Sequence, residues 1–309
     1  MDSDCDTRSW PPVGVDISSD NSYRTYKDDQ NPELLFDKAM GYLDHITANH
    51  RAYYRTPNYK ENIVKRVNDS LINAIYGSNM IERAGLCWPD TFNHCNEVLR
   101  GVDPEVDSDS DNIQGLREVV NHMRAYQHIL RRFVFEGEDM SEALIKDTHS
   151  ILCKGIPIND PEYPEVPYEG YAGKYRTVHV GAGGTMFVTP KFVPAKMTEM
   201  CAELKKELDE GSQGLDPFSV ASKYSLRFVE IHPFLDGNGR MCRMILNAIL
   251  FRYLGVVVSI GGSAKDRVEY LNIKKRSSRD MEGHGEYATF VLDKGVIALK
   301  DLQQGFQWY

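Results

Sequence analysis

The chain has 309 residues, enough for one large domain or two smaller ones with a hydrophobic core. Hydrophobic residues make up 41% and charged residues 26%, which is typical of folded globular proteins and excludes a disordered or fibrous chain. Lys and Arg number 36 against 45 Asp and Glu, so the net charge is -9 and we do not expect a nucleic-acid-binding protein.

The cysteines show no spacing typical of a zinc site or a redox dithiol, which predicts scattered reduced thiols; they lie at positions 5, 87, 95, 153, 201 and 242. The N-terminal residues lack the basic and apolar regions of a secretory signal. The longest apolar stretch, 244–260, is interrupted by Asn247 and Arg252 and is too short to span a bilayer. We therefore expect an intracellular protein of the cytoplasm or the nucleus, without a membrane segment.

Residues 1–30 have little hydrophobic periodicity and predict a flexible N-terminal arm. Apolar residues at helical spacing begin after Asn31 and Pro32, which suit the N-cap and first turn of a helix. A second helix is predicted over about 63–75. We expect Gly77 to close it, because glycine accepts the left-handed conformation at a helix C-terminus.

Ser78 can then cap a short helix that runs through Glu82. A further helix is predicted from Asp90 to just before Gly101. These segments predict an N-terminal helical region over 31–110.

Residues 102–112 are acidic, and four carboxylates match a calcium-loop template at Asp107, Asp109, Asp111 and Glu118. The position that requires a sharp turn holds Asn112 in place of glycine. A solvated acidic loop before the next helix is therefore the favoured interpretation.

Strong helical patterns follow at 113–133 and 141–153, and further helices are predicted to begin near 190, 217 and 240. Residues 157–173, rich in Pro, Tyr and Gly, predict an irregular loop. Residues 175–188 predict two short strands around a glycine turn. The pattern as a whole predicts a mainly α fold, a helix bundle with one β-hairpin.

The segment HPFLDGNGRMCR, residues 232–243, lies between two amphipathic helical patterns. Gly237 and Gly239 allow positive φ and the close approach of a ligand. Backbone N–H groups at the start of the following helix favour an anion. Arg240 and Arg243 are three residues apart on that helix, and guanidinium groups suit phosphate oxygens.

Asp236 would repel a polyphosphate unless a cation lay between them, and Mg²⁺ binds through one or two carboxylates plus phosphate oxygens. His232 can accept a proton from a hydroxyl group. Each feature alone also fits a turn between helices with a core histidine. Their occurrence within twelve residues predicts a magnesium-polyphosphate site with a general base, without identifying the reaction.

The segment resembles the signature of the Fic (Fic/Doc) family, HPFx(D/E)GNGRxxR, at every fixed position. Residues 118–126, 144–152 and 172–190 resemble the family's core helices and its substrate-positioning flap, so the resemblance covers about 60–295. It implies a Fic-type helical bundle with a β-hairpin flap beside the active-site loop. It also implies a catalytic core over 111–295, followed by a C-terminal tail over 296–309.

The resemblance implies Mg²⁺-dependent transfer of AMP from ATP to a Ser, Thr or Tyr hydroxyl of a target protein (AMPylation). In that reaction His232 would be the catalytic base, Asp236 the magnesium ligand and Phe234 the core anchor of the loop. The ATP phosphates would be held by Gly237, Asn238, Gly239, Arg240 and Arg243.

The flap strand would position the target segment by adding it as an extra strand, through Thr185, Met186 and Phe187. Tyr270 is a candidate for the adenine pocket. The resemblance does not identify the target protein, and a homodimer is compatible with it. Neither nucleic acid nor a membrane is expected as a partner.

Ser78 and Glu82 resemble the family's inhibitory motif, (S/T)xxxE(G/N), in the class II arrangement, where it precedes the signature. The resemblance implies that Glu82 pairs with Arg243 and so removes the guanidinium group from the γ-phosphate. In relatives this glutamate also supports de-AMPylation, by orienting a water molecule. Arg83 stands where the family has Gly or Asn, and it either competes with Arg243 for Glu82 or points to solvent.

Two other functions remain open. The site could transfer another phosphate-linked group, such as UMP, phosphate or phosphocholine. The chain could also be a non-enzymatic interaction protein that binds nucleotide as a signal. Intact His232 and Asp236 count against this last function, because a binding module needs no general base.

Overall fold

The computed structural model describes residues 16–28, 30–53, 56–104, 112–160, 163–182, 185–211, 214–279 and 283–305. Most of these residues are helical, as predicted, and the chain divides into two compact units. The first unit comprises Met1–Ala74, Leu208–Lys223 and Leu246–Tyr309, and the second Ile75–Glu207 and Tyr224–Ile245. Most of the acidic segment, residues 105–111, lies outside the described residues.

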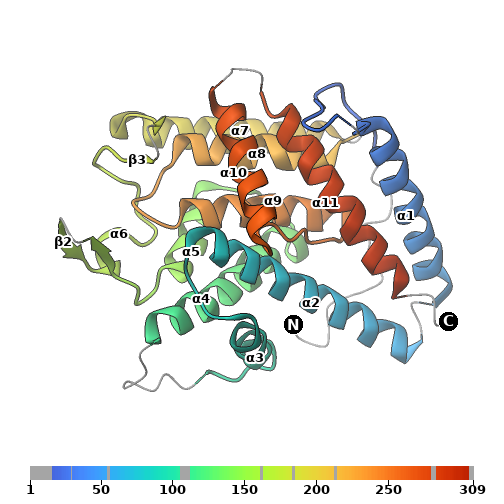
Figure 1. Ribbon diagram of the computed structural model, residues 1–309, viewed down its shortest axis with the longest axis horizontal. Coiled ribbons are helices and arrows are strands. Elements are labelled where there is room, and N and C mark those ends of the chain that lie inside the picture. The colour runs from blue at the N-terminus through green and yellow to red at the C-terminus, as the bar shows by residue number, and fades with distance from the viewer. Residues whose placement is uncertain are drawn as a thin grey trace. The chain divides into compact units, whose positions relative to one another are not determined.

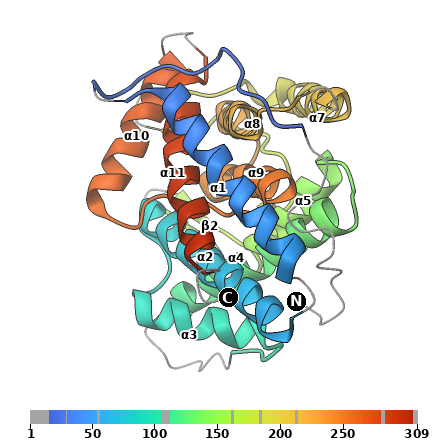
Figure 2. The same cartoon turned by 90° about the vertical axis from the view of Figure 1, so that its right-hand side faces the viewer.

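In the first unit, helix α1 (Pro32–Tyr53) packs along α11 (Gly285–Gln304), and α10 (Ala264–Arg279) also contacts α11 (Figures 1 and 2). The predicted N-cap of α1 is confirmed, because the Asn31 Oδ1 atom accepts the backbone N–H of Leu34 at 3.2 Å. Residues 296–304, expected as part of a C-terminal tail, belong to α11.

Part of the expected N-terminal arm is held against the start of α8 (Pro217–Ile231). The Asp216 carboxylate accepts hydrogen bonds from the Tyr23 hydroxyl at 2.9 Å and from the backbone N–H of Asp20 at 3.1 Å. The same carboxylate accepts the N–H groups of Phe218 and Ser219 and so caps α8.

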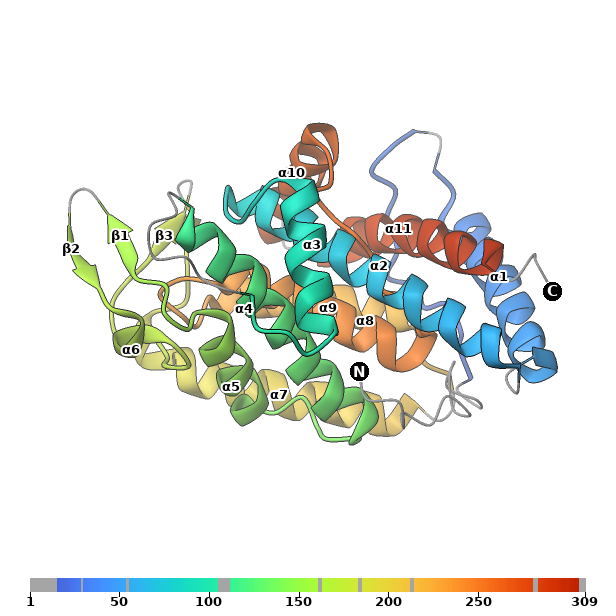
Figure 3. The same ribbon diagram turned by 90° about the horizontal axis from the view of Figure 1, so that it is seen from below.

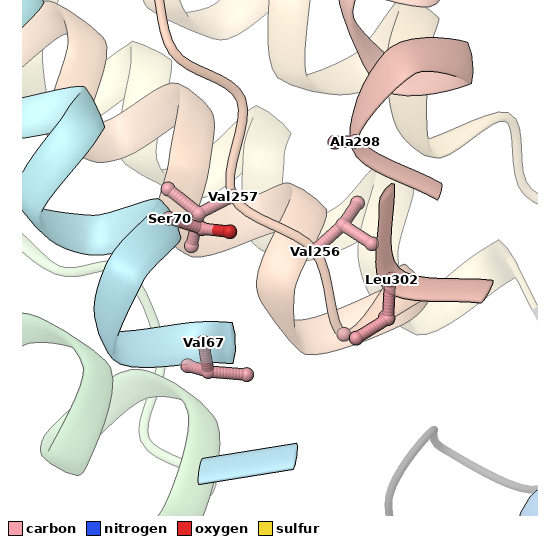
Figure 4. Close-up of a pocket in the computed structure, with 7 residues that line it drawn as sticks. Val67, Ser70, Val256, Val257, Ala298 and Leu302 are labelled. Carbon is pink, nitrogen blue, oxygen red and sulfur yellow. The ribbon is translucent and has the colours of Figure 1, made fainter. Parts of the chain in front are cut away.

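A small cavity in this unit is lined by Val67 and Ser70 of helix α2 (Pro57–Glu82), Val256 and Val257 of the loop before α10, and Ala298 and Leu302 of α11 (Figure 4). Its volume of about 10 Å³ is room for about one water molecule. We therefore place no ligand there.

The second unit is arranged around α4 (Ile113–Leu130), which packs against α3 (Trp88–Leu99) and α5 (Glu142–Leu152) (Figure 3). Helix α4 ends in a π-helical turn, η2 (Arg131–Phe135). Ser141 caps α5, since its hydroxyl accepts the backbone N–H of Leu144 at 3.2 Å. A 3₁₀ turn, η3 (Pro190–Phe192), leads into α7 (Val193–Glu210).

The predicted hairpin is confirmed as β3 (Gly181–Ala182) and β4 (Thr185–Met186), which pair antiparallel. The irregular loop expected over 157–173 was wrong, because β1 (Ile158–Asp160) and β2 (Tyr163–Val166) form a second hairpin before the short helix α6 (Tyr168–Tyr171). Pro164 fits within β2 because every strand of a two-stranded sheet is an edge strand. Among its described residues, the second unit therefore contains two hairpins where the sequence predicted one.

Helix α2 (Pro57–Glu82) is continuous, so the predicted break at Gly77 was wrong. A glycine inside a helix costs about 1 kcal/mol relative to alanine. Beyond it the helix is held by burial of Ile81 and by hydrogen bonds of Ser78 and Asn79, which together offset that cost. The helix ends only after Glu82, where Arg83 has a φ of +57°.

The described cysteines, residues 87, 95, 153, 201 and 242, form no disulfide with one another. None of the helices that the structure describes has the length and apolar character needed to cross a membrane.

Candidate active site

The motif residues 232–243 comprise the loop after α8, residues 232–237, and the first turns of helix α9 (Asn238–Leu254), within the second unit. The Phe234 ring is fully buried and stacks on the ring of His149, with 3.7 Å between centroids. The Asn238 side chain accepts the N–H of Phe234 at 3.0 Å and donates to its carbonyl at 2.9 Å. Packing and hydrogen bonds thus fix the loop against the core, and Phe234 is its anchor.

His149, on α5, supports the other side of the loop. Its Nε2 donates to the carbonyl of Asp236 at 2.9 Å, and its Nδ1 accepts the backbone N–H of Gly173 at 2.9 Å. Burial lowers the pKa of His149 to about 4, so the ring stays neutral. A Cβ at Gly237, whose φ is +74°, would lie 3.0 Å from His149 Nε2. Glycine is therefore required for this turn.

His232 begins the loop with a φ of +50°, a backbone conformation rarely adopted by residues other than glycine. Its ring stacks on Phe187 with 3.8 Å between centroids. The Nδ1 atom lies 3.1 Å from the carbonyl oxygen of Val229, which can only accept, so Nδ1 carries the proton. Burial, with a contribution from the charge of Arg176, lowers the pKa of His232 to about 4. Nε2 therefore has a free lone pair at neutral pH.

Arg176 is a positioning residue that the sequence did not single out. Its buried guanidinium group donates to the His232 carbonyl at 2.6 Å, to the Val178 carbonyl at 2.9 Å, and to the carbonyls of Val188 and Ile231. These carbonyls belong to the end of α8, to the loop that follows it and to the segments that flank the β3–β4 hairpin. One side chain thus connects His232 to the predicted flap.

Two donors of Arg240 are available for an anion. The side chain is buried, and its Nη2 donates to Asp236 at 3.0 Å. Nε and Nη1 have no hydrogen-bond partner among the described residues. Unpaired buried donors are costly, and here they lie at the N-terminus of α9, where backbone N–H groups also favour an anion.

The guanidinium group of Arg243, in contrast, is hydrogen-bonded to residues at the end of α2. Its Nε donates to the Ser78 hydroxyl at 2.8 Å, and its Nη2 donates to the Ser78 carbonyl at 3.1 Å and to Glu82 Oε1 at 2.6 Å. A Cβ built on Gly239 would collide with the Glu82 carboxylate. Glu82 therefore lies against the N-terminus of α9. Arg83 is exposed and forms no ion pair with Glu82 in the described structure.

The remaining residues predicted from the sequence lie outside the motif. Met186 of β4 is 75% exposed, and the neighbouring Thr185 pairs with Ala182 through the backbone. Tyr270 lies in the first unit, where its ring packs against Tyr287 and Phe290, and its assignment to an adenine pocket stays a prediction.

Of the four carboxylates of the calcium template, the structure describes only Glu118, on α4. Its carboxylate is 7% exposed and accepts the backbone N–H of Gly85 and the side-chain amide of Gln114. Within the described ranges, no three His, Cys, Asp or Glu side chains gather as metal ligands.

A sequence profile of the Fic/DOC family matches residues 139–250. A Fido domain-containing protein of Dictyostelium discoideum is 34% identical over 110 residues, which cover 36% of this chain and 74% of that protein. The chain belongs to the Fic/DOC family. The resemblance of its motif to the Fic signature is thereby confirmed.

Longer Fic relatives match over part of their length. The protein adenylyltransferase fic-1 of Caenorhabditis briggsae is 38% identical over 81 residues, 26% of this chain but only 15% of fic-1. The protein adenylyltransferase Fic of Nematostella vectensis is 30% identical over 122 residues, 39% of this chain and 26% of that protein.

Solved structures confirm the Fic fold. A Fic domain containing signaling protein from Bacteroides thetaiotaomicron has a TM-score of 0.65 at 20% identity, over 90% of this chain and 97% of that one. Fic-1 of C. elegans has a TM-score of 0.63 at 19% identity, over 88% of this chain and 73% of that one. The predicted mainly helical Fic bundle is correct.

Proposed function

We propose that this Fic protein transfers AMP from ATP to a hydroxyl group of a target protein. The observation that carries the proposal is the pairing of a neutral base with an anion site in one loop. His232 offers an unprotonated Nε2, and the unpartnered donors of Arg240 lie at the N-terminus of α9. A module that only bound nucleotide would need the second feature and not the first.

In the proposed reaction, Nε2 of His232 removes the proton of the target hydroxyl, whose oxygen attacks the α-phosphorus of ATP. The bond from that phosphorus to the bridging oxygen breaks, and pyrophosphate leaves. Negative charge on the phosphates is held by backbone N–H groups at Gly237, Asn238 and Gly239 and by Arg240. These donors are preorganised because Phe234 and Asn238 fix the loop.

Asp236 fits a magnesium ligand. Its side chain is 49% exposed beside Arg240, and Mg²⁺ typically binds one or two carboxylates together with phosphate oxygens. When bound there, Mg²⁺ would neutralise part of the triphosphate charge.

The β3–β4 hairpin would position the target. Its strands form a separate two-stranded sheet, and Met186 offers an exposed apolar side chain beside the strand edge. An extended target segment can therefore add as a further strand through backbone hydrogen bonds. Because Phe187 stacks on His232, a segment bound there lies close to the base.

We also propose that the described state is autoinhibited. Glu82 occupies Arg243 and adds a negative charge at the N-terminus of α9, where the triphosphate must bind. The same carboxylate is 36% exposed and can orient a water molecule for removal of AMP from a modified protein. We therefore include de-AMPylation as the reverse activity of this site.

The test is auto-modification with labelled ATP, with the adduct mass read by mass spectrometry. Glu82→Gly should raise labelling well above wild type, and an added His232→Ala should abolish labelling while ATP still binds. Labelling that survives His232→Ala would remove the base assignment. An unchanged rate in Glu82→Gly would refute autoinhibition.

A comparison of nucleotide donors distinguishes AMP transfer from the two other functions considered. UTP or CTP preferred over ATP would indicate a different transferred group. Binding of ATP without transfer to any acceptor in the Glu82→Gly variant would favour a non-enzymatic interaction protein.

A further inference from the structure

The last turn of α2 and the turn after it contact α4 as well as Arg243. Asn79 Oδ1 lies 3.0 Å from Nδ1 of His122, and the backbone N–H of Gly85 donates to Glu118 Oε2 at 2.6 Å. Glu118 and His122 are four residues apart on α4 and so share one face of that helix. Residues 79–85 are thus attached to α4 at two points outside the phosphate-binding loop.

The contact of Asn79 with His122 is buried, and the contact of Gly85 with Glu118 is partly buried. His122 is fully buried and Glu118 is 7% exposed. Burial, with the nearby charges of Arg240 and Arg243, holds the pKa of His122 well below its usual value, so the ring is neutral. It donates its Nδ1 proton to the amide oxygen of Asn79. A buried donor or acceptor that loses its partner is costly, so each contact favours the observed position of this segment.

Two glycines allow this close packing. Gly85 has a φ of +78°, and a Cβ there would lie 2.8 Å from Asn79 Nδ2. A Cβ at Gly115, in the first turn of α4, would lie 2.7 Å from the carbonyl oxygen of Gly85. The turn therefore rests directly on the backbone of α4.

The last turn of α2 is consequently held from two sides. Ser78 and Glu82, four residues apart, bind Arg243, whereas the neighbouring Asn79 binds His122. We propose that His122 and Glu118 are positioning residues that keep Glu82 in reach of Arg243. This inference rests on the autoinhibition proposed above, and it makes α4 part of the inhibitory device.

A positioning role and a purely structural role predict opposite changes in activity when these side chains are removed. If His122 and Glu118 only supported the fold, their removal would lower both stability and activity. If they hold the inhibitory turn, their removal raises activity while Glu82 is still present. Damage to the fold cannot produce such an increase.

The experiment measures initial rates of auto-modification with ATP and Mg²⁺. Glu118→Ala and His122→Ala should each raise the rate by about threefold to tenfold, the factor expected for one lost hydrogen bond, and less than Glu82→Gly does. Neither change should raise the rate further when combined with Glu82→Gly, because the carboxylate they position is then absent.

Two variants serve as matched controls. Glu118→Gln keeps an oxygen that accepts the Gly85 N–H and should stay near the wild-type rate. Arg124→Ala alters the same helix, but Arg124 pairs with Asp103 and should leave the rate unchanged.

Wild-type rates in both Glu118→Ala and His122→Ala, beside a raised rate in Glu82→Gly, would overturn the inference. A wild-type rate in Glu82→Gly would instead overturn autoinhibition itself. If thermal unfolding shows that His122→Ala does not fold, Asn79→Ala removes the same contact from the other partner, and its rate decides.

Discussion

Arg83 combines an unusual backbone conformation with an exposed side chain. Its φ of +57° is left-handed, which costs a residue other than glycine about 1 kcal/mol or more. The family's usual Gly or Asn at this position is therefore explained by backbone geometry, because both adopt positive φ easily. The competition with Arg243 considered from the sequence does not occur in this structure, since Glu82 pairs with Arg243.

Arg83→Gly should stabilise the protein by about 1 kcal/mol, because glycine relieves the strain at this turn. It should also lower the basal rate of auto-modification, since the turn that follows Glu82 becomes more favourable. Urea denaturation and the labelling assay measure the two effects. Arg83→Ala is the control, because it removes the charge and keeps the strain. Equal stabilisation by Gly and Ala would assign the effect to the charge.

The second residue-scale prediction concerns the protonation of His232. Because burial lowers its pKa to about 4, the ring should remain neutral, with its proton on Nδ1, from pH 8 down to about pH 5. Nitrogen NMR of the ring distinguishes the two tautomers and the charged form. The urea-unfolded protein is the reference, where histidine titrates near 6.5. A midpoint near 6.5 in the folded protein would contradict the burial argument.

The sequence singled out the motif residues 232–243 because they are contiguous. The sequence did not predict the roles of His149, Arg176 and His122, because these residues are not contiguous with the residues that they bind. Their partners lie 87, 56 and 43 residues away in the chain, so no local spacing marks them. The pairing of Glu82 with Arg243, 161 residues apart, was predicted only because family resemblance supplied it.

At the scale of elements, α2 and α9 meet where Gly239 contacts the Glu82 carboxylate. Gly239→Ala should destabilise the wild type by about 2 kcal/mol, because the new methyl group displaces Glu82 from its charged hydrogen bond with Arg243. In the Glu82→Gly background the same substitution should cost nothing, since the clash is gone. A double-mutant cycle by urea denaturation measures the coupling.

Gly262→Ala is the matched control for this cycle, because a Cβ there meets nothing within 4 Å. Its effect should be identical in both backgrounds. A cost of Gly239→Ala that persists without Glu82 would show that the methyl group clashes with another part of the loop.

Most helices were predicted because their apolar periodicity is strong, and the errors have physical causes. Gly77 reads as a helix terminator, yet tertiary contacts of Ser78 and Asn79 carry α2 through it. The prolines around β1 and β2 indicate a loop. In a two-stranded hairpin, however, some backbone positions need no N–H donor, and Pro164 can occupy one of them. Both outcomes depend on distant contacts that local propensity does not contain.

For the whole molecule, the two units should respond differently to acid. The second unit holds His122, His149 and His232, whose pKa values are lowered mainly by burial. On acidification below about pH 6.5 their unfolded forms take up protons and the folded forms do not, so stability is lost. In the first unit, burial raises the pKa of Asp216 to about 6, so its contribution to stability grows as pH falls from 6 towards 4.

Acidification from pH 7 to pH 5 should therefore loosen the second unit first. Each histidine with a pKa near 4 costs about 2 kcal/mol at pH 5. Hydrogen exchange, corrected for the intrinsic effect of pH, should show lost protection in α4 and α5 while α1 and α11 stay protected. If α1 and α11 lost protection first, the first unit would be the more acid-sensitive one, and the prediction would be wrong.

Both units are assembled from separated stretches of the chain, and this has a practical consequence for shortened proteins. A fragment limited to the profile match at 139–250 would lose Ser78 and Glu82, and with them the autoinhibition proposed above. It would also lose α1. The ring of Phe218, which packs on Phe36 in the full chain, would then be exposed. Inactivity of such a fragment would therefore reflect the missing helices of both units as well as its chemistry.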